Sequence, residues 1–568
     1  MKPLLALLLF LFSLDAGAAS YTLATPPVHV PITIQNRLLA KITAVQQAWA
    51  NLPYRTGTVH YYCDCGTNAE ADCVVGNNAN SGLTTALPRR TLAQAVTDFA
   101  SLSSGDTIAL CKGGAFDAIG DTTLGSSGRC AAGSACNDFR EFAPTTFTGT
   151  AKPLINYSGS GNAIAISAYS TEKSGIRILN LHIKGVGSGV GIFTYNNGPH
   201  TPNKDMVIGN VTIEFFNNGI QTESSGSLGS VNNVQMTGNT LIDNVSMALQ
   251  GASDNSSFSY NYLLNNGNNA IGNHSIYISA DSPLGEAVNY DIIGNYVYGQ
   301  SSATCVGGSV IGHGNINGLN VKDNWIEIAD ADTTPGCWGL SFNNQDAYPS
   351  GEYFRNAVFS GNVVINGGNL GFNVSVCPSC IIENNIVVFN TITTDTTGMR
   401  IPTLAAGTSP ADDVNTANTV RNNTVYFGPG TTSYTKTGIE FGTEGTSHIS
   451  ANNTVYYGGT SGSIRCFNYT LAVSAYTFID NNHCYSASSS YTWDVLHGAT
   501  LAAWRTYSGK DTNSLVNSNP LFTSASTYNF TPGAGSPLIG AGSNANKSTL
   551  DFLRKTRPNP PAIGAFEP

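Results

Sequence analysis

The stretch Val207-Ile208-Gly209-Asn210-Val211-Thr212-Ile213 contains the pattern that decides the fold of this chain. An apolar residue is followed three positions later by asparagine, and then by further apolar or β-branched residues. The same pattern returns, in places loosely, around Asn180, Asn239, Asn261, Asn295, Asn324, Asn362, Asn385, Asn423, Asn453 and Asn482. The mean spacing is about 30 residues, a period typical of solenoids and other repeat arrays.

Each repeat has the composition of strands and turns. The segments around the asparagines are short, β-branched or aromatic, and bounded by Gly, Asn and Ser. A second set of strand-like segments lies between them, such as Ser275–Ser279 and Gly438–Phe441. We expect coils of short strands stacked in parallel, with each asparagine at a turn where it tolerates the left-handed conformation and bonds the asparagines of neighbouring coils. Eleven coils would form a rod roughly 50 Å long. The alternative is an irregular all-β protein in which the asparagines are only turn residues.

The composition excludes one class of partner. Charged residues make up only 11% of the 568 residues, the net charge is −10, and the pI is near 5.3. A nucleic-acid-binding protein would need a basic face, so no such partner is expected. A polysaccharide remains compatible even if it is anionic, because a local cleft or a bound cation can oppose the net charge.

The N-terminus predicts export. One lysine precedes the apolar run Leu4–Phe12 and the small residues that end at Ala19, which is the pattern of a signal peptide cleaved near Ala18 or Ala19. That run is too short to span a membrane, and no later stretch is long enough. We therefore expect a secreted or surface protein, without a transmembrane segment and monomeric.

The twelve cysteines fit an oxidising compartment. Cys377 and Cys380 are spaced for a local disulfide, whereas Cys466 lies one repeat from Cys484. Cys305 and Cys337 could join adjacent coils, and Cys130 and Cys136 share one loop. The remaining cluster contains Cys63, Cys65, Cys73 and Cys111. It could form disulfides or, less in keeping with its spacing, bind zinc.

Both ends of the chain resemble secreted β-helix proteins. Near the start, Asn77–Leu83, Pro88–Ala95 and Ser104–Ile108 resemble a capped opening, and the chain closes on Ile563-Gly564-Ala565-Phe566-Glu567. From about Val59 to Pro568 the chain resembles the right-handed parallel β-helix proteins of the pectate-lyase-like superfamily. The resemblance implies an all-β solenoid of about 11 or more coils, with an N-terminal capping helix over Thr91–Leu102 and a C-terminal wrap. The expected division is 1–19 signal peptide, 20–58 lead-in with a short helix, 59–150 cap and first coils, 151–485 β-helix and 486–568 wrap.

Strand alternation predicts a binding face on the second set of strands. The inward residues are expected to be Ile220, Met247, Ile276, Val310, Leu340, Phe372, Met399 and Ile439. The outward columns then read Gln221, Ala248, Tyr277, Ile311, Ser341, Asn373, Arg400 and Glu440, and beside them Glu223, Gln250, Ser279, His313, Asn343 and Ser375. A linear glycan could lie across this face, and the candidate substrate-binding residues are Tyr277, Gln250, Glu223, Asn343, Asn373 and Glu440. The alternative is a merely solvated surface.

The resemblance implies polysaccharide-lyase chemistry. β-Elimination needs a group that neutralises the uronate carboxylate, a base for the C5 proton, and an acid for the leaving oxygen. The candidate catalytic residues are Lys322, His313, His274 and Arg400. An acidic run that could bind Ca²⁺ contains Glu327, Asp330 and Asp332, although such a loop can also be simply solvated.

Other functions remain open on the same scaffold. Gly312-His313-Gly314 is similar to a tripeptide of polygalacturonases, but the paired aspartates of that family are missing one coil upstream. A glycoside hydrolase would need two carboxylic groups across the scissile bond. A uronan epimerase is the other enzymatic alternative, and a non-catalytic glycan-binding surface or matrix protein is the alternative from a different class.

Overall fold

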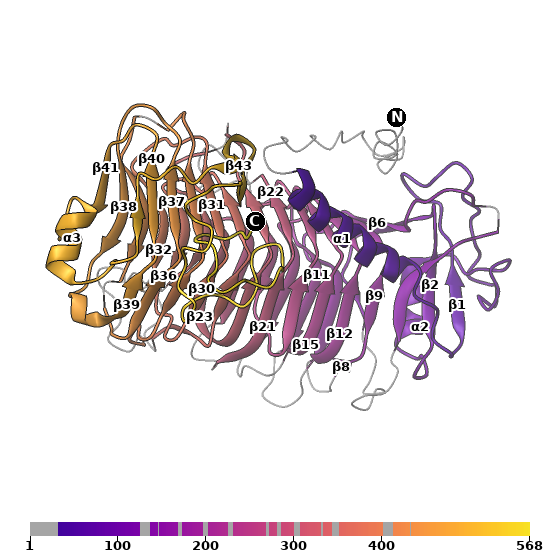
Figure 1. Ribbon diagram of the computed structural model, residues 1–568. Helices are drawn as coiled ribbons and strands as arrows, with labels where there is room; N and C mark the ends of the chain where they lie inside the picture. Colours follow the sequence, from indigo (N-terminus) through magenta and orange to yellow (C-terminus); the bar gives the residue numbers. More distant parts are fainter. Residues whose placement is uncertain are drawn as a thin grey trace, which may run out of the picture.

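The computed structural model shows one long rod of stacked coils, a right-handed parallel β-helix, as the sequence predicts (Figure 1). It describes residues 32–568 except 125–136, 146, 169–172, 197–202, 225–230, 268–271, 281–285, 300–306, 331–332, 344–350, 402–412, 432 and 443. The predicted signal peptide, Cys130, Cys136, Cys305 and Asp332 lie outside the described residues. Each coil contributes strands to three parallel ladders, called sheets A, B and C below.

Sheets A and C share one strand, β23 (Gly307–Lys322), which runs through both. Sheet C contains β4 (Thr122–Thr123), β7 (Asn162–Ala168), β11 (Val190–Asn196), β14 (Asn218–Ser224), β17 (Met247–Gly251), β20 (His274–Ala280), the first half of β23, β25 (Cys337–Phe342), β29 (Leu370–Val374), β32 (Thr396–Ile401), β35 (Lys436–Phe441), β38 (Ile464–Tyr469) and β41 (Tyr491–Asp494). Sheet A contains β1 (Val59–Tyr62), β2 (Thr107–Cys111), β5 (Asp138–Phe142), β8 (Lys173–Ser174), β9 (Arg177–Leu179), β12 (Asn203–Gly209), β15 (Val231–Thr237), β18 (Ser256–Ser259), β21 (Ala287–Ile293), the second half of β23, β26 (Tyr353–Arg355), β27 (Val358–Ser360), β30 (Ile381–Glu383), β33 (Thr419–Arg421), β36 (His448–Ala451) and β39 (Tyr476–Asp480).

Sheet B follows sheet A in every coil and has 14 short strands. They are β3 (Ala115–Ala118), β6 (Leu154–Tyr157), β10 (His182–Lys184), β13 (Thr212–Glu214), β16 (Thr240–Ile242), β19 (Tyr262–Leu264), β22 (Tyr296–Tyr298), β24 (Trp325–Glu327), β28 (Val363–Ile365), β31 (Ile386–Phe389), β34 (Thr424–Phe427), β37 (Thr454–Tyr457), β40 (His483–Ser486) and β42 (Leu515–Val516). The inward residues of all three sheets are aliphatic or aromatic and form one core along the rod. The β-branched and aromatic content of these strands thus serves both pleated pairing and burial.

The turn between sheets A and B holds a ladder of buried asparagines, as predicted, but the register differs at its start. Asn239 donates to the Asn261 side-chain oxygen at 3.0 Å, and the ladder continues coil by coil to Asn482. Strand pairing aligns Gly209 with Thr237, so Asn210 corresponds to Gly238 and precedes the ladder position. The positive φ falls on this preceding residue, for example 52° at Asn210 and 69° at Gly238. The prediction that the ladder asparagine itself adopts the left-handed conformation is therefore wrong.

The ladder predicts a specific loss of stability. Asn295 donates to Asn324 and to the Phe258 carbonyl, each at 2.9 Å, and its side-chain oxygen accepts from Asn261. We expect Asn295→Ala to lower the free energy of unfolding by about 2–4 kcal/mol, because it leaves buried polar groups unsatisfied. Urea unfolding followed by circular dichroism measures this. Asn289→Gly is the control: that asparagine makes a similar 2.9 Å bond on the exposed surface, and glycine tolerates its φ of 55°. This change should cost under about 1 kcal/mol.

Helices cover both ends and one long side of the rod (Figure 1). The predicted capping helix is α2 (Leu92–Phe99), whose Thr91 side chain accepts from the Gln94 amide as N-cap and whose Leu92, Ala95 and Phe99 are buried. At the opposite end, α3 (Leu501–Ser508) buries Trp504. The lead-in helix α1 (Ile32–Ala50) packs along the rod, where Gln35 donates to the Tyr296 hydroxyl at 2.8 Å. These elements hide the apolar ends of the coil stack.

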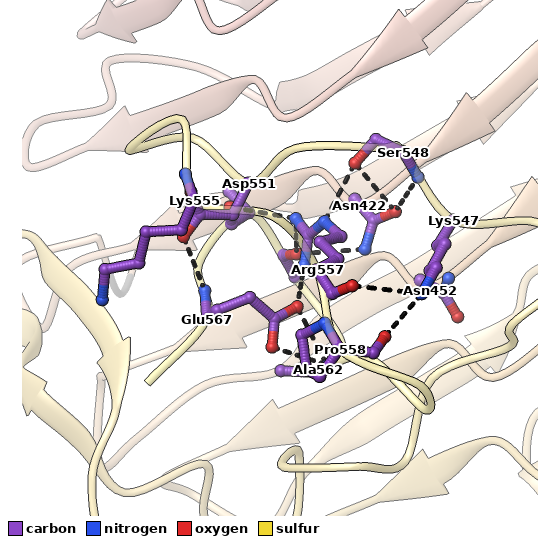
Figure 2. A network of polar contacts seen from close by, with 12 residues as sticks. Asn422, Asn452, Lys547, Ser548, Asp551, Lys555, Arg557, Pro558, Ala562 and Glu567 are labelled. Atoms are coloured by element: carbon purple, nitrogen blue, oxygen red, sulfur yellow. Dashed lines mark hydrogen bonds and ion pairs between the residues drawn. The ribbon is translucent and has the colours of Figure 1, made fainter.

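The last residues of the chain form a strap, defined here as Ser543–Pro568, that runs back over the turns between sheets A and B (Figures 1 and 2). The asparagines just before the ladder position hold it. The Ser543 amide donates to Asn452 at 2.7 Å, and the Ser548 amide donates to Asn422 at 3.0 Å. Asn384 donates to the Leu550 carbonyl at 2.9 Å. The predicted wrap is thus present. The hairpin β43 (Phe522–Ser524) and β44 (Asn529–Pro532) precedes the strap and packs on sheet B.

Disulfides reinforce both halves of the rod, and the predicted local disulfide is confirmed. Cys377 bonds Cys380 and Cys466 bonds Cys484. In the N-terminal cluster Cys63 bonds Cys111 and Cys65 bonds Cys73, so the alternative of a zinc site there is wrong. The grouping of Cys63, Cys73 and Cys111 sulfur atoms therefore reflects disulfide bonds.

Candidate functional site

The outer face of sheet C carries the two predicted columns of outward side chains and a third column. The third column arises because each strand bends at its start. Gly339 and Leu340 both face the core: a Cβ at Gly339 would lie 2.2 Å from the Val364 side chain, and Leu340 is buried. Residues at the Gly339 position in neighbouring coils are accordingly small. The residue before this bend therefore faces outward, although strict alternation from Leu340 places it inside. Trp338 is such a residue, and so are His274 and Arg465.

The bend corrects two of the sequence assignments on this face. Leu249, not Met247, aligns with Ile220 and Ile276, so Gln250 stands in the same column as Gln221 and Tyr277. Ala248 occupies the position of the small residues and lies in the core. The backbone of Glu223 is in β14, but its side chain lies outside the described part of the chain.

His313 is the most constrained of the candidate catalytic residues. Its Nδ1 donates to the Asn343 carbonyl at 2.6 Å, and the Glu352 carboxylate lies 3.8 Å from the same nitrogen. A carbonyl oxygen only accepts, so the proton is on Nδ1 and the lone pair is on Nε2. Burial lowers the pKa of His313 from 6.5 to about 4, which makes the imidazole neutral near pH 7. Glu352 is itself buried and accepts from the Gly314 amide at 2.7 Å.

The face brings His313 together with Tyr277 and His274. The ring centroids of His274 and Tyr277 are 5.3 Å apart with nearly parallel planes, and those of Tyr277 and His313 are 5.8 Å apart. Both histidines are buried, whereas Tyr277 is half-buried. The phenol ring therefore sits between two imidazoles at the surface of adjacent coils, as β20 and β23 pair with Tyr277 beside Ile311.

A hydrogen-bonded relay fixes the carbonyl that holds His313. The Asn373 amide donates to the Ser341 hydroxyl at 3.0 Å, and that hydroxyl donates to the Asn343 side-chain oxygen at 2.8 Å. Asn343 thus accepts a hydrogen bond from Ser341 through its side-chain oxygen and one from His313 through its backbone carbonyl. Two of the predicted substrate-binding residues, Asn343 and Asn373, therefore position the imidazole in this structure.

Further along the same face a pocket of about 240 Å³ opens near Arg400 and Glu440. Arg400 pairs with Glu440 at 2.9 Å, and Asn468 donates to the other Glu440 oxygen at 3.0 Å. The pocket is lined by Trp338, Asn369, Leu370, Asp395, Thr396, Thr397, Arg400, Thr435, Thr437, Glu440 and Arg465. Arg400 lies three coils from β23, so the structure separates it from His313 by about 14 Å along the rod.

Lys322 does not belong to this face. It ends β23 on the sheet A side, where it pairs with Ile293 and Ser360. The backbone passes from sheet C to sheet A after Gly314, and the strand continues for eight residues to Lys322. Lys322 is therefore separated from His274, His313 and Arg400, although the coil count had placed all four together.

The predicted calcium ligands lie on yet another side of the rod. Glu327 ends β24 in sheet B, where it accepts from the Trp325 indole at 2.9 Å. Burial raises the pKa of Glu327 to about 7, which favours its neutral form. Asp330 is exposed and accepts from Asn366 at 2.5 Å. A buried carboxyl that resists ionisation fits a calcium ligand poorly, and Asp332 is outside the described residues, so calcium stays a prediction.

Sequence reasoning missed four residues of this face: Trp338, Asp395, Arg465 and Glu352. Trp338 and Arg465 were hidden by the bend at the start of each sheet C strand. The signal that could have revealed the bend is the column of small residues, among them Gly219, Gly339, Gly371, Gly398 and Gly438. Glu352 follows a long loop, and no local pattern ties it to His313.

No protein-family model matches the chain, and no curated protein matches it. Among solved structures, it is similar to the Dettilon tailspike protein gp208, with 11% identity over 67% of each chain and a TM-score of 0.40. It is also similar to the lacto-N-biosidase of Eubacterium ramulus, with 13% identity over 65% of this chain and 68% of that chain and a TM-score of 0.41. A third is the A-module of the Azotobacter vinelandii mannuronan C-5 epimerase AlgE4, with 14% identity over 66% and 92% and a TM-score of 0.39.

Likenesses at this level carry no argument about the reaction. Within residues 32–568, apart from the gaps given above, no helix is long and apolar enough to cross a membrane. The fold itself rests on the register of the three ladders and on the stacked asparagines. By these features the chain is a right-handed parallel β-helix.

Proposed function

We propose that the protein is an exported carbohydrate-active enzyme that cleaves an acidic polysaccharide by β-elimination on the outer face of sheet C. One observation carries the proposal: His313 is buried, neutral and held in one tautomer beside the half-buried phenol of Tyr277. A neutral imidazole with a fixed orientation can act as the base that removes the proton next to a carboxylate. The disulfides are in keeping with an oxidising compartment.

In the proposed step, His313 Nε2 removes the C5 proton of a uronate residue. The electron pair forms the C4–C5 double bond as the C4–O4 bond breaks, and the Tyr277 hydroxyl gives its proton to the leaving oxygen. The products are an unsaturated uronate end and a new alcohol end, and the two side chains exchange protons with water afterwards. Tyr277 lies one coil from His313, so base and acid can reach neighbouring atoms of one chain.

The test is an assay on alginate, pectate and glycosaminoglycans, each with added Ca²⁺ and with a chelator. An increase in ultraviolet absorbance from unsaturated uronate is the expected result on at least one of them. Loss of that signal with the chelator would support the predicted calcium site. No increase on any acidic glycan contradicts the elimination mechanism; retained binding without cleavage would then assign a glycan-binding protein.

The acid side of the pH profile offers a second test. The base must be unprotonated, and burial lowers the pKa of His313 from 6.5 to about 4. Activity should therefore persist as the pH falls below 6.5 and disappear as it passes through about 4. The measurement is kcat/KM against pH, which reports ionisation of the free enzyme. A midpoint near 6.5 would show that the essential base is not this buried imidazole.

A glycoside hydrolase is the second candidate, because two carboxylates line the pocket near Arg400. Asp395 accepts from the Thr435 amide at 2.9 Å, and Glu440 pairs with Arg400. Hydrolysis would require these two groups to act as acid and base across one glycosidic bond. New reducing ends without ultraviolet absorbance, abolished by Glu440→Gln, would favour this reaction.

A further inference from the structure

We propose that the pocket bounded by Trp338 and Arg465 is an extended subsite for the same polysaccharide chain, in which one sugar ring lies against Trp338 and the carboxylate of a more distant uronate ring binds Arg465. The proposal rests on the function proposed above and adds the part of the site that recognises the chain away from the reacting bond. The pocket opens on the outer face of sheet C, over β25, β29, β32, β35 and β38. It therefore begins one coil from His313 and extends over four further coils of the same face.

Trp338 supplies a stacking surface. Its indole nitrogen donates to the Asn369 side-chain oxygen at 2.6 Å, which fixes the ring plane, and the side chain is only half-buried. Next to it, Leu370 adds apolar surface, while Thr397 and Thr437 add hydroxyl groups in one column. An apolar plate with hydroxyls at its edge suits a pyranose ring, which has apolar C–H faces and a polar rim.

The Arg465 end of the pocket favours a ring that carries a carboxylate. The Asp395 carboxylate, which also lines the pocket, precedes β32 and is two coil steps from β38. Glu440 neutralises Arg400, and Asn468 satisfies the other oxygen of that carboxylate. Arg465 is exposed and forms no ion pair with any side chain in the described part of the protein. Its guanidinium can bind a carboxylate through two parallel hydrogen bonds, which a neutral sugar does not offer.

The distance to His313 determines the size of the ligand. Trp338 lies in the coil next to β23, whereas Arg465 in β38 is five coil steps from β23, or about 24 Å. One sugar ring is too short to occupy both places. A single substrate must therefore be an oligosaccharide that lies along the rod axis, with the bound uronate several residues from the cleaved bond.

The experiment measures binding of uronate oligomers of two to six residues, made from alginate and pectate, to the His313→Gln variant by calorimetry. That background removes turnover. Adding Trp338→Ala should weaken binding roughly tenfold, because one stacking contact is lost. Adding Arg465→Gln should weaken binding roughly tenfold for acidic oligomers but not for the same oligomers with their carboxyl groups reduced to alcohols.

Two controls make the outcome decisive. Arg90→Gln removes an exposed guanidinium on the N-terminal cap and should change no affinity. Circular dichroism confirms that the pocket variants fold. If Trp338→Ala and Arg465→Gln bind all oligomers as the parent does, the subsite is wrong even though the enzyme cleaves. If reduced and acidic oligomers bind alike, the ring is neutral and the carboxylate assignment is wrong. Failure of the proposed function is separate, since it would show as absent cleavage with the oligomer binding intact.

Discussion

The His313→Gln variant is expected to lower kcat by about 10²- to 10⁴-fold, with little change in KM and in the midpoint of thermal unfolding. Glutamine can still donate to the Asn343 carbonyl, so the local hydrogen bond that Nδ1 makes at 2.6 Å can survive. It offers no basic nitrogen to take the C5 proton. The measurement is the initial rate of ultraviolet absorbance on the acidic glycan that the native enzyme cleaves.

Two comparisons show whether the loss is chemical. His497→Gln alters a histidine at the far end of the rod, beside Asp494, and should keep full activity. Tyr277→Phe keeps the ring between the two imidazoles but lacks the acidic hydroxyl, so kcat should fall while oligomer binding stays. If His313→Gln retains most of the native rate, the base lies elsewhere on the molecule and the proposed step is wrong.

The Arg557→Met variant is expected to lose about 3–5 kcal/mol of unfolding free energy. Arg557 is buried and pairs with Glu567 at 2.5 Å within the strap (Figure 2). It joins the strap to the rod by donating to the Asn384 side chain at 2.7 Å. It also donates to the Gly564 and Ala565 carbonyls at 2.9 and 3.0 Å. Methionine fills a similar volume but leaves the Glu567 carboxylate buried without its cation. This unpaired buried charge accounts for most of the expected loss of unfolding free energy.

Urea unfolding of two further variants separates charge from packing. Adding Glu567→Gln to Arg557→Met should recover part of the loss, because the unpaired buried charge is removed. Arg554→Met breaks the exposed pair with Asp323 and should cost under about 1 kcal/mol. Equal losses for Arg554→Met and Arg557→Met would show that the strap is not held by its buried arginine.

The fold was predictable from the sequence because the repeat specifies it several times over. Each asparagine of the ladder is bonded to the coil before it and the coil after it. A pattern such as Ile292-Ile293-Gly294-Asn295 therefore fits only one position in the coil. Asn210 was misplaced by one position because Val211 fills the ladder position in that coil. The Val211 amide donates to the Asn239 side-chain oxygen, as the amide of Asn239 does to Asn261, so this coil keeps the backbone bond and lacks only the side-chain bond.

The candidate site was predictable only in part, because it depends on how coils bend. His274, Tyr277 and His313 follow from counting along sheet C strands, and the structure brings them together. Lys322 was grouped with them by sequence distance, but the passage from sheet C to sheet A inside β23 sends it to another face. Trp338 was not predicted to face outward, because two successive residues, Gly339 and Leu340, face the core and interrupt the strand alternation.

The strap alters how the rod as a whole can unfold. A solenoid with contacts only between neighbouring coils behaves as a one-dimensional array, so its ends can fray while its middle stays intact. Asn384, Asn422 and Asn452 belong to successive coils, and Asp323 lies two coils before Asn384. All four bind one segment that is translated last. Opening any of these coils also strains the contacts of the others. The C-terminal half of the rod therefore becomes a single cooperative unit, which is completed only when the end of the chain has been made and has docked.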